Sequence, residues 1–221
     1  MIRNLIWETD GVLFDTNPAV TYAISQSLNE MGCSIALNVV DDLARQSLDF
    51  CVDTLAARFK LDPALLRQRF AERYRQIPPE RQLPFPGARE VCAWIVARGG
   101  LNLIATARKA ESTRALLAAH GMTDLFRDIF TPEQGYPCKP NPAILLAALE
   151  KHALNPAETL LICRNEHDIQ AGQAAGVATC RFGSADVSSL PSLRVKEYRA
   201  LLTYLDELSQ QGAVFQRNLS E

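Results

Sequence analysis

The sequence predicts an α/β protein with a Rossmann-like parallel sheet core and an inserted helical cap domain. From residue 84 onward, short apolar runs alternate with helical patterns, which is typical of a parallel sheet wound by crossover helices. Between the first apolar run and residue 84 the patterns are only helical, which indicates an insert. A chain of 221 residues is long enough for both parts. We therefore expect a core formed by 1–16 and 84–221 and a cap formed by 17–83.

The individual elements follow from apolar periodicity. Buried strands are expected where short apolar runs end at a polar residue or a turn signal, at 2–7, 101–105 and 159–163. Helices are expected in the core at 88–98, 110–120, 142–152 and 168–175, and in the cap at 19–31, 40–59 and 63–74. The proline-rich segment 78–87 is expected to return the chain from the cap to the core.

Composition narrows the possible partners. The formal charge is −2, from 23 basic and 25 acidic residues, and no long basic block is present, so neither a nucleic acid nor a membrane surface is expected as a partner. No stretch of about 18 apolar residues occurs, and the first apolar run is too short for a signal peptide, which predicts a cytoplasmic location. The six cysteines form no Cys-x-x-Cys pair and are expected to be reduced core residues. A small molecule is the expected partner, and a protein partner stays open.

The residues that follow the predicted strands, together with one residue in the loop before the third strand, are mostly polar. They are Glu8, Thr9 and Asp10, then Thr106 and Ala107, then Lys139, and finally Arg164 and Asp168. Ligands bind outside the carboxyl ends of the strands in an open parallel sheet, so we expect these residues to form one site. The set offers carboxylates for nucleophilic and acid chemistry, a hydroxyl, and a lysine that can hold a phosphate.

In this order, the motifs resemble those of the haloacid dehalogenase superfamily, in the helical-cap branch that resembles phosphoglycolate phosphatases and β-phosphoglucomutases. The resemblance is carried by Glu8-Thr9-Asp10-Gly11-Val12-Leu13-Phe14-Asp15, Thr106, Lys139-Pro140-Asn141-Pro142, and Asp168 with Ala174-Ala175-Gly176. The segment Pro84-Phe85-Pro86-Gly87-Ala88 is similar to the usual return from cap to core. The resemblance covers nearly the whole chain.

The resemblance implies a phosphatase site with Mg²⁺ as its cofactor. It implies catalytic positions at Glu8, Asp10 and Lys139, phosphate-binding positions at Thr106, Ala107 and Lys139, and metal-binding positions at Glu8, Asp10 and Asp168. Its implied ligand is a small phosphorylated or otherwise anionic metabolite. Arg164 is a further candidate for phosphate binding, because its guanidinium can bind an anion directly.

Two positions depart from the family pattern. The first motif resembles Asp-x-Asp-Gly, but its first position is Glu8, whose extra methylene moves the carboxylate oxygens by up to ~1.5 Å. A misplacement of about 1 Å can cost roughly a hundredfold in rate. The fourth motif has Arg164 in place of an aspartate, and a guanidinium has no lone pair to offer Mg²⁺. Asn165 or Glu166 can restore a ligand only if their loop shifts.

Three hypotheses about function stay open. In the first, Mg²⁺-dependent phosphatase activity is impaired or lost, and the chain binds a small phosphorylated or carboxylated metabolite, with Arg164 pairing with Glu8 or gripping the ligand. In the second, the chain is an active phosphomonoester phosphatase of the phosphoglycolate or sugar-phosphate type, with Glu8 as nucleophile and Asp10 as acid. In the third, it is a structural or regulatory partner protein in which Arg164 stabilises buried carboxylates.

Overall fold

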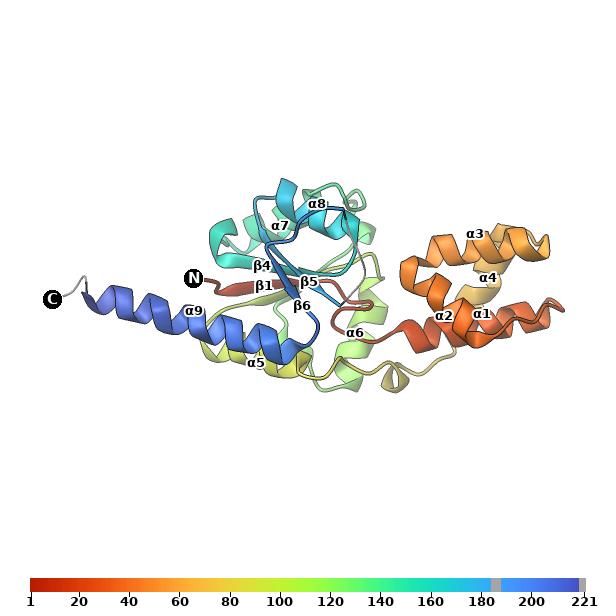
Figure 1. Cartoon of the computed structure of the whole chain (residues 1–221), viewed down its shortest axis with the longest axis horizontal. Coiled ribbons are helices and arrows are strands. Elements are labelled where there is room, and N and C mark those ends of the chain that lie inside the picture. The colour runs from red at the N-terminus through yellow and green to blue at the C-terminus, as the bar shows by residue number, and fades with distance from the viewer. Residues whose placement is uncertain (184–187, 219–221) are drawn as a thin grey trace. The chain divides into compact units, whose positions relative to one another are not determined.

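The structure, a computed structural model, describes residues 1–183 and 188–218, with side chains described to residue 210. The chain divides into two compact units (Figure 1). Unit 1 comprises Met1–Phe14 with Pro84–Glu221, and unit 2 comprises Asp15–Leu83. The expected domain boundaries, 1–16 with 84–221 for the core and 17–83 for the cap, stay a prediction.

Unit 1 is built on one parallel sheet with the strand order β3-β2-β1-β4-β5-β6. Its strands are β1 Asn4–Trp7, β2 Asn102–Ala105, β3 Asp128–Phe130, β4 Thr159–Cys163, β5 Ala178–Phe182 and β6 Leu193–Val195. The strand order reverses between β1 and β4, and in such sheets ligands bind at the carboxyl ends of the two strands that flank the reversal. The sheet confirms the predicted α/β fold class with a Rossmann-like core.

Helices cover both faces of this sheet (Figure 1). On one face lie α5 Ala88–Ala97, α6 Ala110–Ala119 and α9 Tyr198–Asn218, and on the other lie α7 Ala143–Lys151 and α8 Glu166–Ala174. Leu5 and Trp7 of β1 belong to the first core and Ile6 to the second, because successive strand residues point to opposite faces. Glu8, two residues after Ile6, therefore continues on the face covered by α7 and α8.

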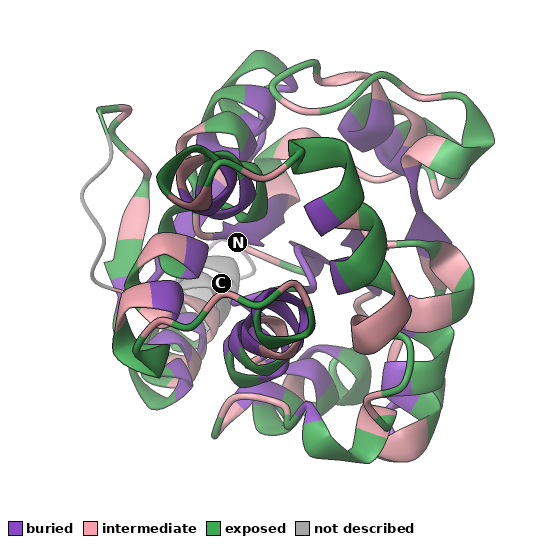
Figure 2. Cartoon of the chain, turned by 90° about the vertical axis from the view of Figure 1, so that its right-hand side faces the viewer, coloured by how far each residue is buried: buried purple, intermediate pink, exposed green. Residues whose placement is uncertain are grey.

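Unit 2 is a group of four helices with its own apolar core. The helices are α1 Asn17–Glu30, α2 Leu37–Gln46, α3 Leu48–Phe59 and α4 Pro63–Tyr74. The single helix expected over 40–59 is wrong, because Ser47 is extended (φ −168°, ψ 157°) and its hydroxyl accepts a hydrogen bond from the Phe50 amide at 3.0 Å. Such a serine caps the helix that follows it. In both units, helices carry buried residues on one side and exposed residues on the other (Figure 2).

Four elements of unit 1 lay outside the sequence-based expectation: β3, β5, β6 and α9. Short 3₁₀ turns also occur at Pro79–Arg81, Thr123–Leu125, Pro132–Gln134 and Pro156–Glu158. All six cysteines are free, as expected, although Cys138 is exposed and does not lie in a core. Across the described parts of the chain, no helix has the length and apolar character needed to cross a bilayer.

Candidate functional site

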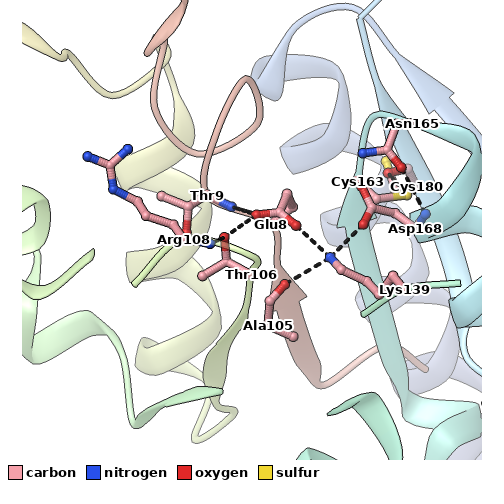
Figure 3. Close-up of polar contacts among 10 residues, drawn as sticks. All are labelled: Glu8, Thr9, Ala105, Thr106, Arg108, Lys139, Cys163, Asn165, Asp168 and Cys180. Carbon is pink, nitrogen blue, oxygen red and sulfur yellow. Dashed lines mark hydrogen bonds and ion pairs between the residues drawn. The ribbon is translucent and has the colours of Figure 1, made fainter. Parts of the chain in front are cut away.

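The backbone brings the predicted site residues to the carboxyl edge of the sheet. The Glu8 amide donates to the Ile162 carbonyl at 3.0 Å, which extends the pairing of β1 with β4 by one residue. On the α8 side, the Asn165 side chain accepts a hydrogen bond from the Asp168 amide at 2.9 Å and so caps the helix. This cap fixes Asp168 in the first turn of α8, facing Lys139 and, beyond it, Glu8 (Figure 3).

The Glu8 carboxylate is buried and both of its oxygens are engaged (Figure 3). Oε1 accepts hydrogen bonds from the Thr9 amide at 2.8 Å and from the Thr106 hydroxyl. Oε2 accepts one from Lys139 Nζ at 2.5 Å. Burial raises the pKa of Glu8, and Lys139 offsets this only in part. Because both oxygens are held by donors of the chain, attack on an external phosphorus requires some of these hydrogen bonds to break.

Lys139 bridges two buried carboxylates. Its Nζ lies 2.5 Å from Glu8 Oε2 and 2.5 Å from Asp168 Oδ1, and it also donates to the Ala105 carbonyl at 3.1 Å. Burial alone lowers the pKa of a lysine, but Asp168 and Glu8 outweigh that effect and raise the pKa of Lys139. The residue is therefore held as a charged ammonium.

Asp10, the expected acid, is held by an arginine that the sequence analysis did not single out. Arg108 Nη1 lies 2.8 Å from Asp10 Oδ1, and Arg108 Nε donates to Ser112 Oγ at 2.9 Å. The Arg108 side chain is only 8% exposed. Its place two residues after Thr106 was a usable signal, since it follows the same strand end. Ala107, between the two, is exposed.

Arg164 lies across the loop that follows β1. A Cβ atom built on Gly11 would come within 2.8 Å of Arg164 Nη1 and 3.4 Å of its Cδ. Gly11 also has a φ of +69°, in the left-handed region that favours glycine, so the backbone conformation favours glycine here, whereas the Arg164 side chain could shift to make room. Arg164 is half-buried, and its guanidinium lies beside Gly11, the residue that follows Asp10.

Few protein oxygens in this part of the structure are free to bind a magnesium ion. Among the residues that the structure describes, no group of three or more His, Cys, Asp or Glu side chains is placed to hold a metal. Among the described residues, Asp168 Oδ2 is a buried oxygen without a hydrogen-bond partner, whereas Asp168 Oδ1 and Glu8 Oε2 are both paired with Lys139. The two candidates for replacement are engaged elsewhere: Asn165 caps α8, and Glu166 accepts hydrogen bonds from the amides of Ser188 and Ser189.

Comparisons with known proteins agree with this fold. Residues 5–182 match the sequence profile described as haloacid dehalogenase-like hydrolase. A phosphoglycolate phosphatase from Aliivibrio fischeri is 24% identical over 92% of this chain and 96% of its own length. Another from Thiobacillus denitrificans is 30% identical over 79% and 80%. The crystal structure of a β-phosphoglucomutase from Clostridium difficile superposes with a TM-score of 0.71 at 18% identity, covering 97% of this chain and all of that one.

Proposed function

Because this chain belongs to the haloacid dehalogenase-like hydrolase family, in its phosphoglycolate phosphatase and β-phosphoglucomutase-like branch, we propose that it keeps the family fold but has little or no Mg²⁺-dependent phosphatase activity. The observation that carries the proposal is the engagement of Glu8, whose two oxygens accept hydrogen bonds from Thr9, Thr106 and Lys139. In-line attack on phosphorus requires one of these oxygens to give up its hydrogen bonds within the chain, which costs free energy in a buried site.

The balance of charge in the site supports the same proposal. Its three carboxylates are Glu8, Asp10 and Asp168. Lys139 pairs with two of them and Arg108 with the third, while Arg164 lies alongside over Gly11. The site is therefore neutralised by its own side chains, and a divalent cation entering it would meet guanidinium groups where it needs oxygen ligands.

We propose that the activity left to such a site is the binding of a small phosphorylated or carboxylated metabolite. Lys139 and Thr106 provide a buried cation and a hydroxyl donor at the carboxyl edge of the sheet, and Arg164 provides a half-buried guanidinium. Charge-assisted hydrogen bonds of this kind are the strong contacts by which proteins hold phosphate and carboxylate groups. Relatives named phosphoglycolate phosphatase act on a ligand of this class, which is consistent with the proposal.

An active phosphatase is the second candidate, favoured by the presence of Asp10, Thr106 and Lys139 at one edge of the sheet. In that reaction Glu8 would form a bond to phosphorus while the bond to the leaving oxygen breaks, and Asp10 would give that oxygen a proton. Glu8 would first have to free one carboxylate oxygen from its hydrogen bonds to Thr9 and Thr106 or to Lys139, and Asp10 would have to leave Arg108.

A steady-state assay with p-nitrophenyl phosphate, run with magnesium and with chelator, separates the two candidates. We expect the native protein and Glu8→Ala to hydrolyse the substrate at the same background rate in both buffers. Activity that requires both magnesium and Glu8 would overturn the proposal and establish the phosphatase.

The double variant Glu8→Asp with Arg164→Asp tests whether these two positions suppress the activity. Glu8→Asp shortens the side chain by one methylene and so draws the carboxylate ~1.5 Å back toward the backbone, and Arg164→Asp removes the guanidinium beside Gly11. We expect magnesium-dependent hydrolysis to rise about a hundredfold or more in the double variant, with each single variant close to background. A double variant as inactive as the native protein would show that the cause of inactivity lies elsewhere in the site.

A further inference from the structure

The three donors around Glu8 converge on one point from three parts of the chain. The Thr9 amide comes from the end of β1, the Thr106 hydroxyl from the end of β2, and the Lys139 ammonium from the loop before α7 (Figure 3). One backbone N–H, one hydroxyl and one buried cation are together the donor set of an oxyanion site. The acceptor that they share is a carboxylate of the chain itself.

We infer that Glu8 is a built-in ligand, whose carboxylate fills an oxyanion site formed by Thr9, Thr106 and Lys139, and that an external phosphate or carboxylate binds there only by displacing it. The inference rests on the proposed function, in which this site binds an anion without hydrolysing it. It adds a regulatory contact within that site: the bound and unbound states differ in where the Glu8 side chain points.

The length of the Glu8 side chain makes this contact possible. An aspartate at the same position would end ~1.5 Å earlier, because it lacks one methylene group. Glu8 instead reaches 2.5 Å from Lys139 Nζ while also accepting hydrogen bonds from Thr9 and Thr106. A tethered ligand competes at an effective concentration in the millimolar range or above, so an external anion at lower concentration is excluded.

Removal of the Glu8 carboxylate leaves the donors in place. Lys139 remains paired with Asp168 Oδ1 at 2.5 Å, so its charge stays compensated and its side chain stays anchored by the Ala105 carbonyl. The site then loses one negative charge and gains the volume of the missing carboxylate. Both changes favour a small oxyanion, since like charges at close range oppose binding.

Isothermal titration with inorganic phosphate, in buffer without divalent cations, tests the inference. We expect Glu8→Ala to bind phosphate about tenfold more tightly than the native protein or more. The matched control is Glu158→Ala, which removes the same charge from a residue paired with Arg3 just before β4, at the opposite edge of the sheet, and is expected to leave binding at the native level. Adding Lys139→Met to Glu8→Ala should abolish the gain.

Equal phosphate affinity in Glu8→Ala and the native protein would overturn the inference. If Glu8→Ala does not fold, Glu8→Asp carries the test, because it keeps the charge but withdraws the carboxylate, and it should bind phosphate more tightly than the native protein. The titration measures phosphate affinity and not hydrolysis, so its result can contradict the built-in ligand without contradicting the proposed loss of phosphatase activity. A native protein that hydrolyses p-nitrophenyl phosphate would refute the proposed function, whereas unchanged phosphate affinity would refute only the built-in ligand.

Discussion

Lys139 is the residue on which the electrostatic balance of the site depends. Glu8, 7% exposed, and Asp168, 1% exposed, are too deeply buried to be solvated as free carboxylates, and the same ammonium contacts both. The structural hypothesis assigned this stabilising role to Arg164. The ammonium that bridges the two buried carboxylates belongs to Lys139, and the stabilising role of Arg164 stays a prediction.

Replacing Lys139 with methionine should therefore destabilise the fold strongly. Lys139→Met keeps much of the side-chain volume but leaves two buried carboxylates without their cation, a change that typically costs about 3–5 kcal/mol. The free energy of unfolding from urea denaturation measures it. The control is Lys151→Met, in which a 57% exposed lysine loses its pair with Asp128, and we expect a loss below about 1 kcal/mol. Losses of equal size in the two variants would contradict a central role for Lys139.

Sequence reasoning could place these residues because strand ends can be read from apolar runs. Glu8, Thr106 and Asp168 each follow such a run, and the structure brings all three within reach of one another or of Lys139. The pairing itself could not be predicted, since it depends on how far each side chain reaches. Arg108 was missed because its role depends on a contact with Asp10, 98 residues away along the chain.

At the scale of elements, the strands that were missed have weak apolar patterns. β3 and β6 are edge strands of three residues each, too short to show a periodicity. β5 is longer, but it contains Arg181, which is 2% exposed, and a buried cation interrupts the apolar run by which a central strand is found. The central strands β1, β2 and β4 were predictable because they are buried on both faces.

The contact between β3 and α7 should make stability depend on pH. Asp128, the first residue of β3, lies 2.7 Å from Lys151 Nζ and 3.0 Å from His152 Nε2 at the end of α7. Partial burial raises the pKa of Asp128, but the hydrogen bonds from Lys151, His152 and the Ile129 amide outweigh it, so the pKa is lowered from 3.8. A carboxyl with a lowered pKa stabilises the fold above its ordinary pKa, and this contribution is lost as the pH falls through the lowered value.

Asp128→Asn tests this dependence. The free energy of unfolding of the native protein should exceed that of the variant at about pH 6, and the difference should shrink as the pH falls below about 4. Asp124→Asn, at an exposed aspartate in the neighbouring 3₁₀ turn, serves as the control and should follow the native curve. A difference between native and Asp128→Asn that stays constant with pH would show that the aspartate acts through shape and not through charge.

At the scale of the whole molecule, unit 2 has what an independently folding part requires. Its apolar core is formed entirely by residues between Asp15 and Leu83, among them Ile24, Leu55 and Leu66, which are fully buried. Capped helix starts at Ser47 and Asp62 add local stability, because each satisfies a backbone amide at a helix end. A segment of about 70 residues is close to the lower limit for a single core, so its stability should be modest but measurable.

We therefore expect a fragment of residues 15–83 to fold alone, with a helical circular dichroism spectrum and a cooperative thermal transition. Leu55→Ala should remove that transition at room temperature or shift it far downward, since deletion of a buried leucine side chain costs about 2–5 kcal/mol, a large part of the stability of so small a core. Leu65→Ala, at a leucine of α4 that is 39% exposed, should melt close to the unmodified fragment. A gradual melt in the unmodified fragment, unaffected by Leu55→Ala, would mean that the helices of unit 2 are ordered only as part of the full chain.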